Sequence, residues 1–435
     1  MLGILHRKGI LPIVLGVLLG SLIFATGSSC LAGSEKELLV FHWWTEGGER
    51  KAAETLITSF EKKFPGVKVI VNPVAGAGGV NLRAILASQL AAGAAPDSFQ
   101  TLEGVKIKTY ADAGYLAPVD EIWAEENLKQ KYLLDDKMMK FGGHYYAVPV
   151  HAHRANVIWG DNGLFRELGL TAPDDVDELI DLCQKIEAQK PGVVPLAFGT
   201  RYKWPVVYLF DPILVSVAGS DFYKRFYTGK LNVEGNDVFR KALEKFGEVV
   251  PFTYRFHASK TCMEACDLIV NGKAAMYIHG DWAYGRFLTA GWKAGEKLFS
   301  HPFPSGIWIG HPDCFTLCKD GPNPVNGKRW LRNLCNPQVQ IDFSLIKGST
   351  GVVRGIGPDA YPEVYRKDNM KDLNNPAVTK MGNAFAGLTP PDFMDDFQTI
   401  LERFLYDRDI DRFVEDTQKA LIADDVAAKM SWYWE

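Results

Sequence analysis

Strand-like and helix-like segments alternate regularly near the start of this chain, and this alternation most constrains the fold. Short apolar or β-branched runs at 38–44, 67–71 and 97–102 predict strands. Residues 49–64 and 82–90 lie between them and carry apolar side chains at helical spacing. Strands that are separated by helices pack as a parallel-rich sheet covered by helical layers. The sequence therefore predicts a layered α/β fold.

The length of the chain indicates two lobes rather than one core. A single hydrophobic core stops growing at about 250–300 residues, and this chain has 435. We expect extended crossovers between the lobes near 147–155, 300–306 and 340–347. The expected N-terminal lobe comprises 33–150 and 304–344, and the expected C-terminal lobe comprises 151–303 and 345–435.

The first 32 residues have the order of an export signal. His6, Arg7 and Lys8 precede an apolar run at 10–24, and small residues follow it. The run is shorter than the roughly 18 apolar residues expected of a spanning helix, although an uncleaved anchor is an alternative. Cleavage after Ala32 would release a free protein, whereas a lipid on Cys30 would anchor it. Either outcome predicts a periplasmic or extracellular protein.

Six cysteines remain after residue 32, out of seven in the chain. An even number of cysteines outside the cytoplasm permits disulfides. Buried free thiols are an equally open alternative, because free cysteine is among the most buried residue types.

Aromatic and acidic side chains gather where the first strand ends. Trp43 and Trp44 close this strand, and Glu49 begins the next helix. Ligands of open α/β sheets bind beyond the carboxyl ends of strands. Indole faces can pack on the C–H surface of a sugar, while a carboxylate accepts hydrogen bonds from hydroxyls. Neighbouring strand residues face opposite ways, so one tryptophan could instead belong to the core.

Several motifs together resemble one protein family, in order along nearly the whole chain after the export signal. They are His42-Trp43-Trp44-Thr45-Glu46-Gly47-Gly48-Glu49, Pro96-Asp97-Ser98-Phe99-Gln100, Gly143-His144-Tyr145, Val148-Pro149-Val150, His153-Arg154-Ala155-Asn156, Gly272-Lys273-Ala274-Ala275, Gly280-Asp281-Trp282-Ala283 and Lys347-Gly348-Ser349. Each motif alone is weak, but their shared order is specific. The chain thus resembles the solute-binding proteins of bacterial ABC sugar importers, above all the glucose- and monosaccharide-binding branch.

The resemblance implies a periplasmic-binding-protein fold, with a hinge and a ligand cleft between the lobes. It implies a membrane permease as partner, and neither catalysis nor a cofactor. The implied ligand contacts are Trp43, Trp44, Glu49, Gln100 and Asp313 from the N-terminal lobe, and Trp282 and Lys347 from the C-terminal lobe. Glu46 and Trp204 are further candidates.

The sequence departs from the family pattern at two positions. Leu102 stands where the family has a basic or imidazole side chain, and Phe385 stands where it has a histidine. The loss of two polar contacts could change which sugar binds, or admit a larger ligand such as a di- or oligosaccharide.

Three other classes of function are weaker alternatives. A glycoside hydrolase would use two of the carboxylates of Glu46, Glu49, Asp281 and Asp313. A dinucleotide site at 76–79 lacks its third glycine, because Asn81 occupies that position. His144, His151 and His153 could suggest a metal, but no further ligand spacing strengthens that interpretation, so no metal site is expected. The net charge of −4 argues against a nucleic-acid partner.

Overall fold

A computed structural model describes residues 35–45, 47–75 and 79–435. The expected export signal, Cys30, Glu46 and the glycines at 76–78 lie outside these described residues.

The first sheet contains the predicted alternation of strands and helices. β1 (Glu37–His42) pairs in parallel with β2 (Lys68–Pro73) and with β3 (Ser98–Leu102). The connecting helices are α1 (Gly47–Lys63) and α2 (Val80–Ala91). Alternate β1 residues Leu38 and Val40 are buried and pack in the first core. The predicted α/β pattern is confirmed here.

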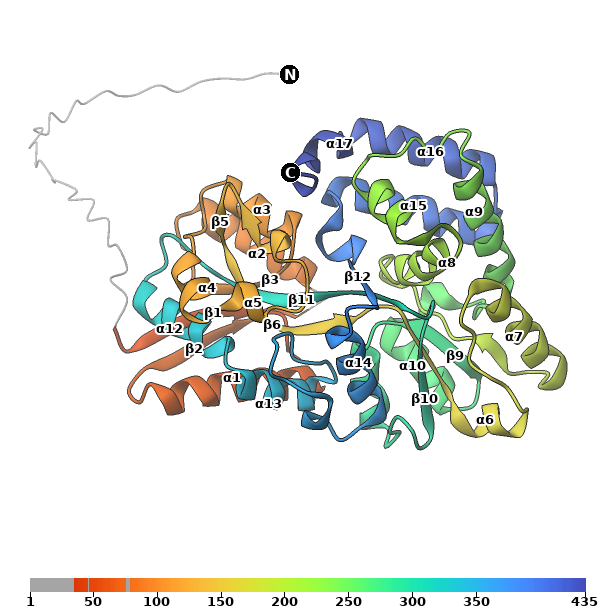
Figure 1. The fold of residues 1–435 in the computed structure, drawn as a ribbon, viewed down its shortest axis with the longest axis horizontal. Coiled ribbons are helices and arrows are strands. Elements are labelled where there is room, and N and C mark those ends of the chain that lie inside the picture. The colour runs from red at the N-terminus through yellow and green to blue at the C-terminus, as the bar shows by residue number, and fades with distance from the viewer. Residues whose placement is uncertain (1–34, 46, 76–78) are drawn as a thin grey trace, which may run out of the picture. The chain divides into compact units, whose positions relative to one another are not determined.

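Long strands connect this sheet to the second half of the fold. β11 (Ile307–Leu317) pairs antiparallel with β3 and with β6 (Ala147–Arg154), and in parallel with β12 (Thr379–Gly382). After β6 the chain enters β7 (Val157–Asp161) of the second sheet. It returns between β10 (Leu298–Pro302) and β11. Figure 1 shows β6 and β11 running between the two groups of elements.

The second sheet has the order β10-β7-β9-β8, with β8 at Val194–Leu196 and β9 at Ala274–His279. The helices of the second lobe pack against this sheet and against one another, and most of those labelled lie on the right of Figure 1. They include α6 (Asn162–Glu167), α7 (Val176–Gln189), α8 (Pro205–Tyr227), α9 (Asp237–Val249), α10 (Cys262–Val270), α11 (Trp282–Thr289), α15 (Pro391–Asp407), α16 (Ile410–Ala423) and α17 (Val426–Lys429). Their apolar faces build a second core, so the predicted two-lobed fold is confirmed.

Shorter elements complete the first lobe. These are α3 (Val105–Asp112), α4 (Asp120–Glu125), α5 (Leu128–Lys131), β4 (Lys140–Phe141), β5 (His144–Tyr145), α12 (Pro324–Leu334), α13 (Pro337–Lys347) and α14 (Val364–Asn374). β4 and β5 pair antiparallel and form a hairpin around Gly142 and Gly143.

One helix of the second lobe, α8, is long and apolar enough to cross a membrane by length and composition alone. Most of its apolar residues are instead buried in the second core. Its helical geometry breaks at Gly219, where φ is 78° and ψ is 173°. Both facts indicate a core helix of a globular lobe.

The last crossover differs from the expected boundary at 344/345. α13 packs against α1, and Val352 and Ile356 after it belong to the first core. α14 contacts both cores, because Leu373 belongs to the first and Tyr365 to the second, and Met381 after it belongs to the second. Gly348, with φ of 91°, ends α13 as a C-cap, so the Lys-Gly-Ser motif marks a helix end rather than a lobe boundary.

The cysteines after residue 34 are free thiols. Cys183, Cys262, Cys266, Cys314, Cys318 and Cys335 are all unpaired and buried. The sequence leaves both disulfides and buried free thiols open, and the structure has buried free thiols.

Candidate functional site

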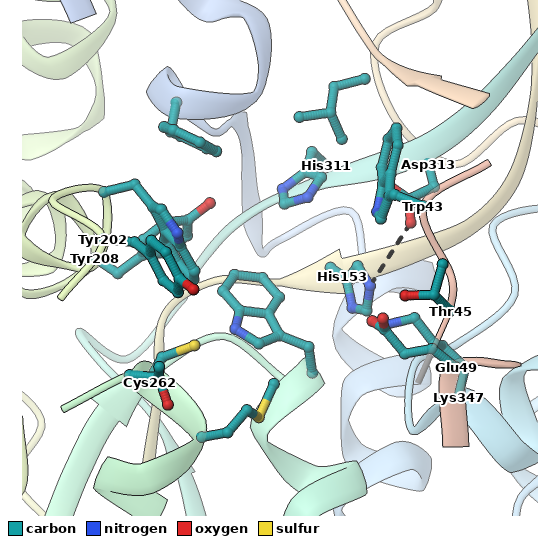
Figure 2. A pocket seen from close by; sticks show the side chains of 16 residues that line it. Trp43, Thr45, Glu49, His153, Tyr202, Tyr208, Cys262, His311, Asp313 and Lys347 are labelled. Atoms are coloured by element: carbon teal, nitrogen blue, oxygen red, sulfur yellow. Dashed lines mark hydrogen bonds and ion pairs between the residues drawn. The ribbon is translucent and has the colours of Figure 1, made fainter. Parts of the chain in front are cut away.

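A pocket of about 350 Å³ is lined by residues of both lobes (Figure 2). The first lobe contributes Trp43, Thr45, Glu49, Leu102 and Lys347. The crossing strands β6 and β11 contribute His153, His311 and Asp313. The second lobe contributes Tyr202, Trp204, Tyr208, Thr261, Cys262, Met263, Trp282 and Phe385. The charged groups thus lie on one side, and most of the aromatic and apolar groups lie on the other.

A backbone hydrogen bond and close packing against a glycine hold Trp43 at the pocket. Its N–H donates to Oε1 of Gln100 over 3.1 Å. Gly79 has a φ of 86°, and a Cβ on it would lie 2.7 Å from the Trp43 ring. The position therefore requires glycine for both its backbone conformation and its space. Gln100 itself is buried behind Trp43 and does not line the pocket, so its role as a direct contact is not supported.

Trp44 was expected at the ligand, and the structure places it in the first core. It is 1% exposed, and its ring lies 4.6 Å from Phe343 and 5.8 Å from Phe315, measured between centroids. The alternation of side chains along an extended segment explains the difference, because it sends Trp43 and Trp44 to opposite sides.

Glu49 and Lys347 form an ion pair at the edge of the pocket. Nζ of Lys347 donates to Oε1 of Glu49 over 2.8 Å. The Lys347 side chain is 3% exposed and that of Glu49 is 37% exposed. Both come from the first lobe, since α13 packs on α1, so the assignment of Lys347 to the C-terminal lobe was wrong.

Aromatic rings form the opposite wall. Trp282 begins α11, and its ring meets Tyr208 edge-on with centroids 5.0 Å apart. Trp204 packs between Trp282 and Phe385, with centroids 5.9 and 5.8 Å away. A Cβ on Gly280 would clash with the Trp282 ring, so glycine lets this indole fold back toward the pocket. The wall offers apolar faces and few ionisable groups.

Two pairs of side chains from the crossing strands form the floor. In the β6–β11 register, His153 lies opposite His311, and His151 lies opposite Asp313. Residues two apart on a strand share a face, so the four side chains gather on one side of the sheet. Nε2 of His151 lies 3.0 Å from Oδ2 of Asp313. Nδ1 of His153 is hydrogen-bonded to Oδ1 of Asp281, at the start of α11.

Burial and neighbouring charges set the ionisation of the floor. Burial by itself would raise the pKa of Asp313, but the hydrogen bond from His151 and the nearby imidazoles hold it below its usual range. Burial lowers the pKa of His153 well below its usual value and that of His311 to about 4. Burial raises the pKa of Asp281 to about 7, against the hydrogen bonds that it accepts. Near neutral pH the floor therefore combines the Asp313 carboxylate with the neutral imidazoles of His153 and His311.

The floor resembles a metal centre only in part. His151, His153 and Asp313 each place one ligand atom within 4.8 Å of the others. A metal-bound imidazole normally donates its second nitrogen to an acceptor, as Nδ1 of His153 can to Asp281. Nδ1 of His151 has no partner among the described residues, and its Nε2 is already bonded to Asp313. These atoms fit a hydrogen-bonding floor better than a metal site.

The pocket brings together eight of the residues that were singled out from the sequence. They are Trp43, Glu49, Leu102, Trp204, Trp282, Asp313, Lys347 and Phe385. His153, His311, Tyr202 and Tyr208 were not proposed as ligand contacts. His311 lies two residues before Asp313 on β11 and so shares its face, and this spacing is visible in the sequence.

Comparison with known proteins assigns the chain to a family. A family model described as bacterial extracellular solute-binding protein matches residues 44–341. The chain belongs to this family. An uncharacterized ABC transporter extracellular-binding protein of Pyrococcus horikoshii is 34% identical, over 97% of each chain. A xylose/arabinose-binding protein of Haloferax volcanii is 28% identical, over 76% of this chain and 73% of that protein.

The fold is shared with solved structures of other proteins. A bacterial solute receptor with a preference for β-D-galactopyranose aligns with a TM-score of 0.78 at 18% identity, covering 91% of this chain and 100% of that one. Membership in an extracellular binding-protein family confirms the expectation of a binding protein rather than an enzyme. The glycoside hydrolase interpretation is therefore set aside.

Proposed function

We propose that this protein captures a small sugar, a monosaccharide such as glucose or a pentose, and delivers it to the permease of an ABC importer. The observation that carries the proposal is the pocket itself, in which an aromatic wall faces Glu49, Lys347 and Asp313. Aromatic rings cover the C–H faces of a sugar, and charged groups pair with its hydroxyls.

The size of the pocket favours a small ligand. Its volume of about 350 Å³ lies near the lower end of the roughly 300–1,000 Å³ range of ligand pockets. The relative from Haloferax volcanii, named for binding xylose and arabinose, is consistent with a monosaccharide. Leu102 and Phe385 reduce the number of polar contacts, so we expect a set of preferred hydroxyls that differs from that of the glucose-binding branch.

Binding would be coupled to closure of the lobes. The ionisable contacts Glu49 and Lys347 come from the first lobe, whereas Trp282 and Trp204 come from the second. A ligand that contacts both sides binds the closed form more tightly and shifts the population toward it. The permease would then recognise the closed form. Export through residues 1–32, with release or with a lipid on Cys30, belongs to the same proposal.

A ligand screen tests the proposal. The mature protein is heated with D-glucose, D-galactose, D-xylose, L-arabinose, maltose and raffinose, and hits are titrated by calorimetry. We expect at least one monosaccharide to raise the melting temperature and to bind without turnover. D313N should abolish that shift, while I422S, a change at an exposed residue of α16, should leave it intact. Tighter binding of raffinose than of every monosaccharide would refute the size argument, and no shift with any sugar would refute the proposal.

A further inference from the structure

The imidazole of His153 is oriented by a fully buried carboxylate. Oδ2 of Asp281 accepts the backbone N–H of Arg154 over 3.1 Å and the hydroxyl of Tyr365 over 3.0 Å. Its other oxygen, Oδ1, is left facing Nδ1 of His153. Because burial raises the pKa of Asp281 to about 7 and lowers that of His153, the pair at pH 8 is a carboxylate and a neutral imidazole. The proton of the ring then lies on Nδ1, where the carboxylate accepts it.

This arrangement leaves Nε2 of His153 as a bare acceptor. It faces Oδ2 of Asp313 at 4.0 Å, along the dashed line in Figure 2. The carboxylate of Asp313 is also an acceptor, and it already takes the Nε2 proton of His151. Two acceptors therefore face each other across a gap too long for a hydrogen bond, with no proton between them.

Both residues line the pocket, so a ligand can reach this gap. Buried acceptors are costly when no donor reaches them. Asp313 and His153 are each only 3% exposed, so the pocket is the side from which a donor can reach them. A hydroxyl group is the donor that a sugar supplies.

We infer that His153 and Asp313 form an acceptor-only subsite that requires a donated hydroxyl proton from the ligand, and that Asp281 sets this requirement by fixing the His153 tautomer. This inference rests on the proposed function, because the donor is a sugar hydroxyl. His153 and Asp313 contact the ligand, whereas Asp281 is a positioning residue that acts through His153. The subsite makes the protein select for a hydroxyl that donates rather than accepts.

Asp281→Asn should reverse the polarity of His153. The amide oxygen of the asparagine should take the place of Oδ2, because Arg154 and Tyr365 both donate there. Its NH₂ group then faces Nδ1 of His153 and donates to it. The ring proton moves to Nε2, and the acceptor becomes a donor. Tyr365→Phe is the matched control, because it removes one hydrogen bond of Asp281 and keeps the carboxyl group facing the ring. That hydrogen bond lowers the pKa of Asp281, so the control is measured at pH 9, where the carboxylate persists.

Deoxy and deoxyfluoro analogues of the tightest-binding monosaccharide from the screen give the readout. Fluorine cannot donate a proton, so at an acceptor-only subsite the fluoro analogue is as weak as the deoxy analogue. We expect one ring position at which both analogues bind the wild-type protein and Y365F at least about tenfold more weakly than the parent sugar at pH 9. In D281N the penalty for the fluoro analogue at that position should fall below about threefold.

Two results would overturn the inference. The first is that no ring position exists at which the deoxyfluoro analogue binds as weakly as the deoxy analogue. The second is that the loss of affinity of the deoxyfluoro analogue is the same in D281N as in the wild-type protein. If D281N does not fold, long-range ¹H–¹⁵N spectra of the wild-type imidazoles decide the matter, because a proton on Nε2 of His153 at pH 8 contradicts the tautomer. If no sugar binds the wild-type protein, the proposed function fails, while the same spectra still test His153.

Discussion

Acid should weaken sugar binding through the His153–Asp281 pair. Burial raises the pKa of Asp281 to about 7, so the pair gains a proton between pH 8 and pH 6. If the proton is on Asp281, the carboxyl O–H donates to Nδ1 of His153, and the ring proton moves to Nε2. If the proton is added to the ring instead, both ring nitrogens carry a proton, including Nε2. Either way His153 no longer accepts the hydroxyl of the ligand.

The size of the effect follows from linkage. If only the unprotonated pair binds sugar, the dissociation constant scales with one plus the ratio of protonated to unprotonated pairs. With a pKa of about 7, this gives a dissociation constant about tenfold larger at pH 6 than at pH 8. The loss corresponds to about 1.4 kcal/mol of binding free energy.

Other ionisable groups face the same pair, and their contributions to the pH dependence of binding must be distinguished from that of the pair. Asp313 stays a carboxylate in this range, because its pKa is held below the usual value, and His311 stays neutral, because burial lowers its pKa to about 4. Further groups that face the pair are His151 on β6, Lys347 on α13 with its partner Glu49 on α1, and Tyr365 on α14.

Calorimetric titration at pH 8, 7 and 6, in two buffers with different ionisation enthalpies, measures both affinity and proton release. We expect nearly one proton to be released per sugar bound at pH 6 and almost none at pH 8. D281N should bind with nearly constant affinity over this range. A constant affinity in the wild-type protein, or an equal loss in D281N, would refute the reasoning.

Three further predictions separate binding from stability. W43A should raise the sugar dissociation constant at least tenfold with little change in melting temperature, whereas W44A should cost about 3–5 kcal/mol of unfolding free energy, because Trp44 is a core residue. E49Q should destabilise the sugar-free protein by about 1–3 kcal/mol in urea unfolding, because it leaves the buried Lys347 ammonium without its partner. K347M should destabilise it less, because the Glu49 carboxylate that it leaves unpaired is partly exposed. Burial raises the pKa of Asp211 to about 7, so the folded wild-type protein holds a proton there that the unfolded chain releases above about pH 4. The free energy of unfolding of the wild-type protein should therefore fall between pH 4 and pH 7. Over the same range the stability of D211N should rise by up to about 4 kcal/mol relative to the wild-type protein, and a pH-independent difference would contradict this.

Local patterns were sufficient for the strands and helices of the first sheet. The runs at 38–44, 67–71 and 97–102 alternate with helical segments, and each element can be recognised from its own residues. The same local reasoning could state that Trp43 and Trp44 face opposite ways. It could not tell which one meets the core, because that depends on Phe343 and Phe315, which are distant in the sequence.

The floor of the pocket depends on long-range pairing. His153 and His311 become neighbours only through the antiparallel register of β6 with β11, and no local pattern sets that register. Lys347 was placed in the wrong lobe for a similar reason. Its helix packs on α1, and a helix that ends at a glycine looks the same from the sequence whichever lobe it covers.

The six buried thiols give this protein an internal probe of how its halves come apart. Cys183, Cys262 and Cys266 lie in elements of the second lobe, and Cys314, Cys318 and Cys335 lie in those of the first. A short pulse of maleimide in rising urea would tag a thiol only after its surroundings melt, and mass spectrometry would count the adducts. Independent melting of the halves would give an intermediate with three tags, whereas concerted melting would pass directly from none to six.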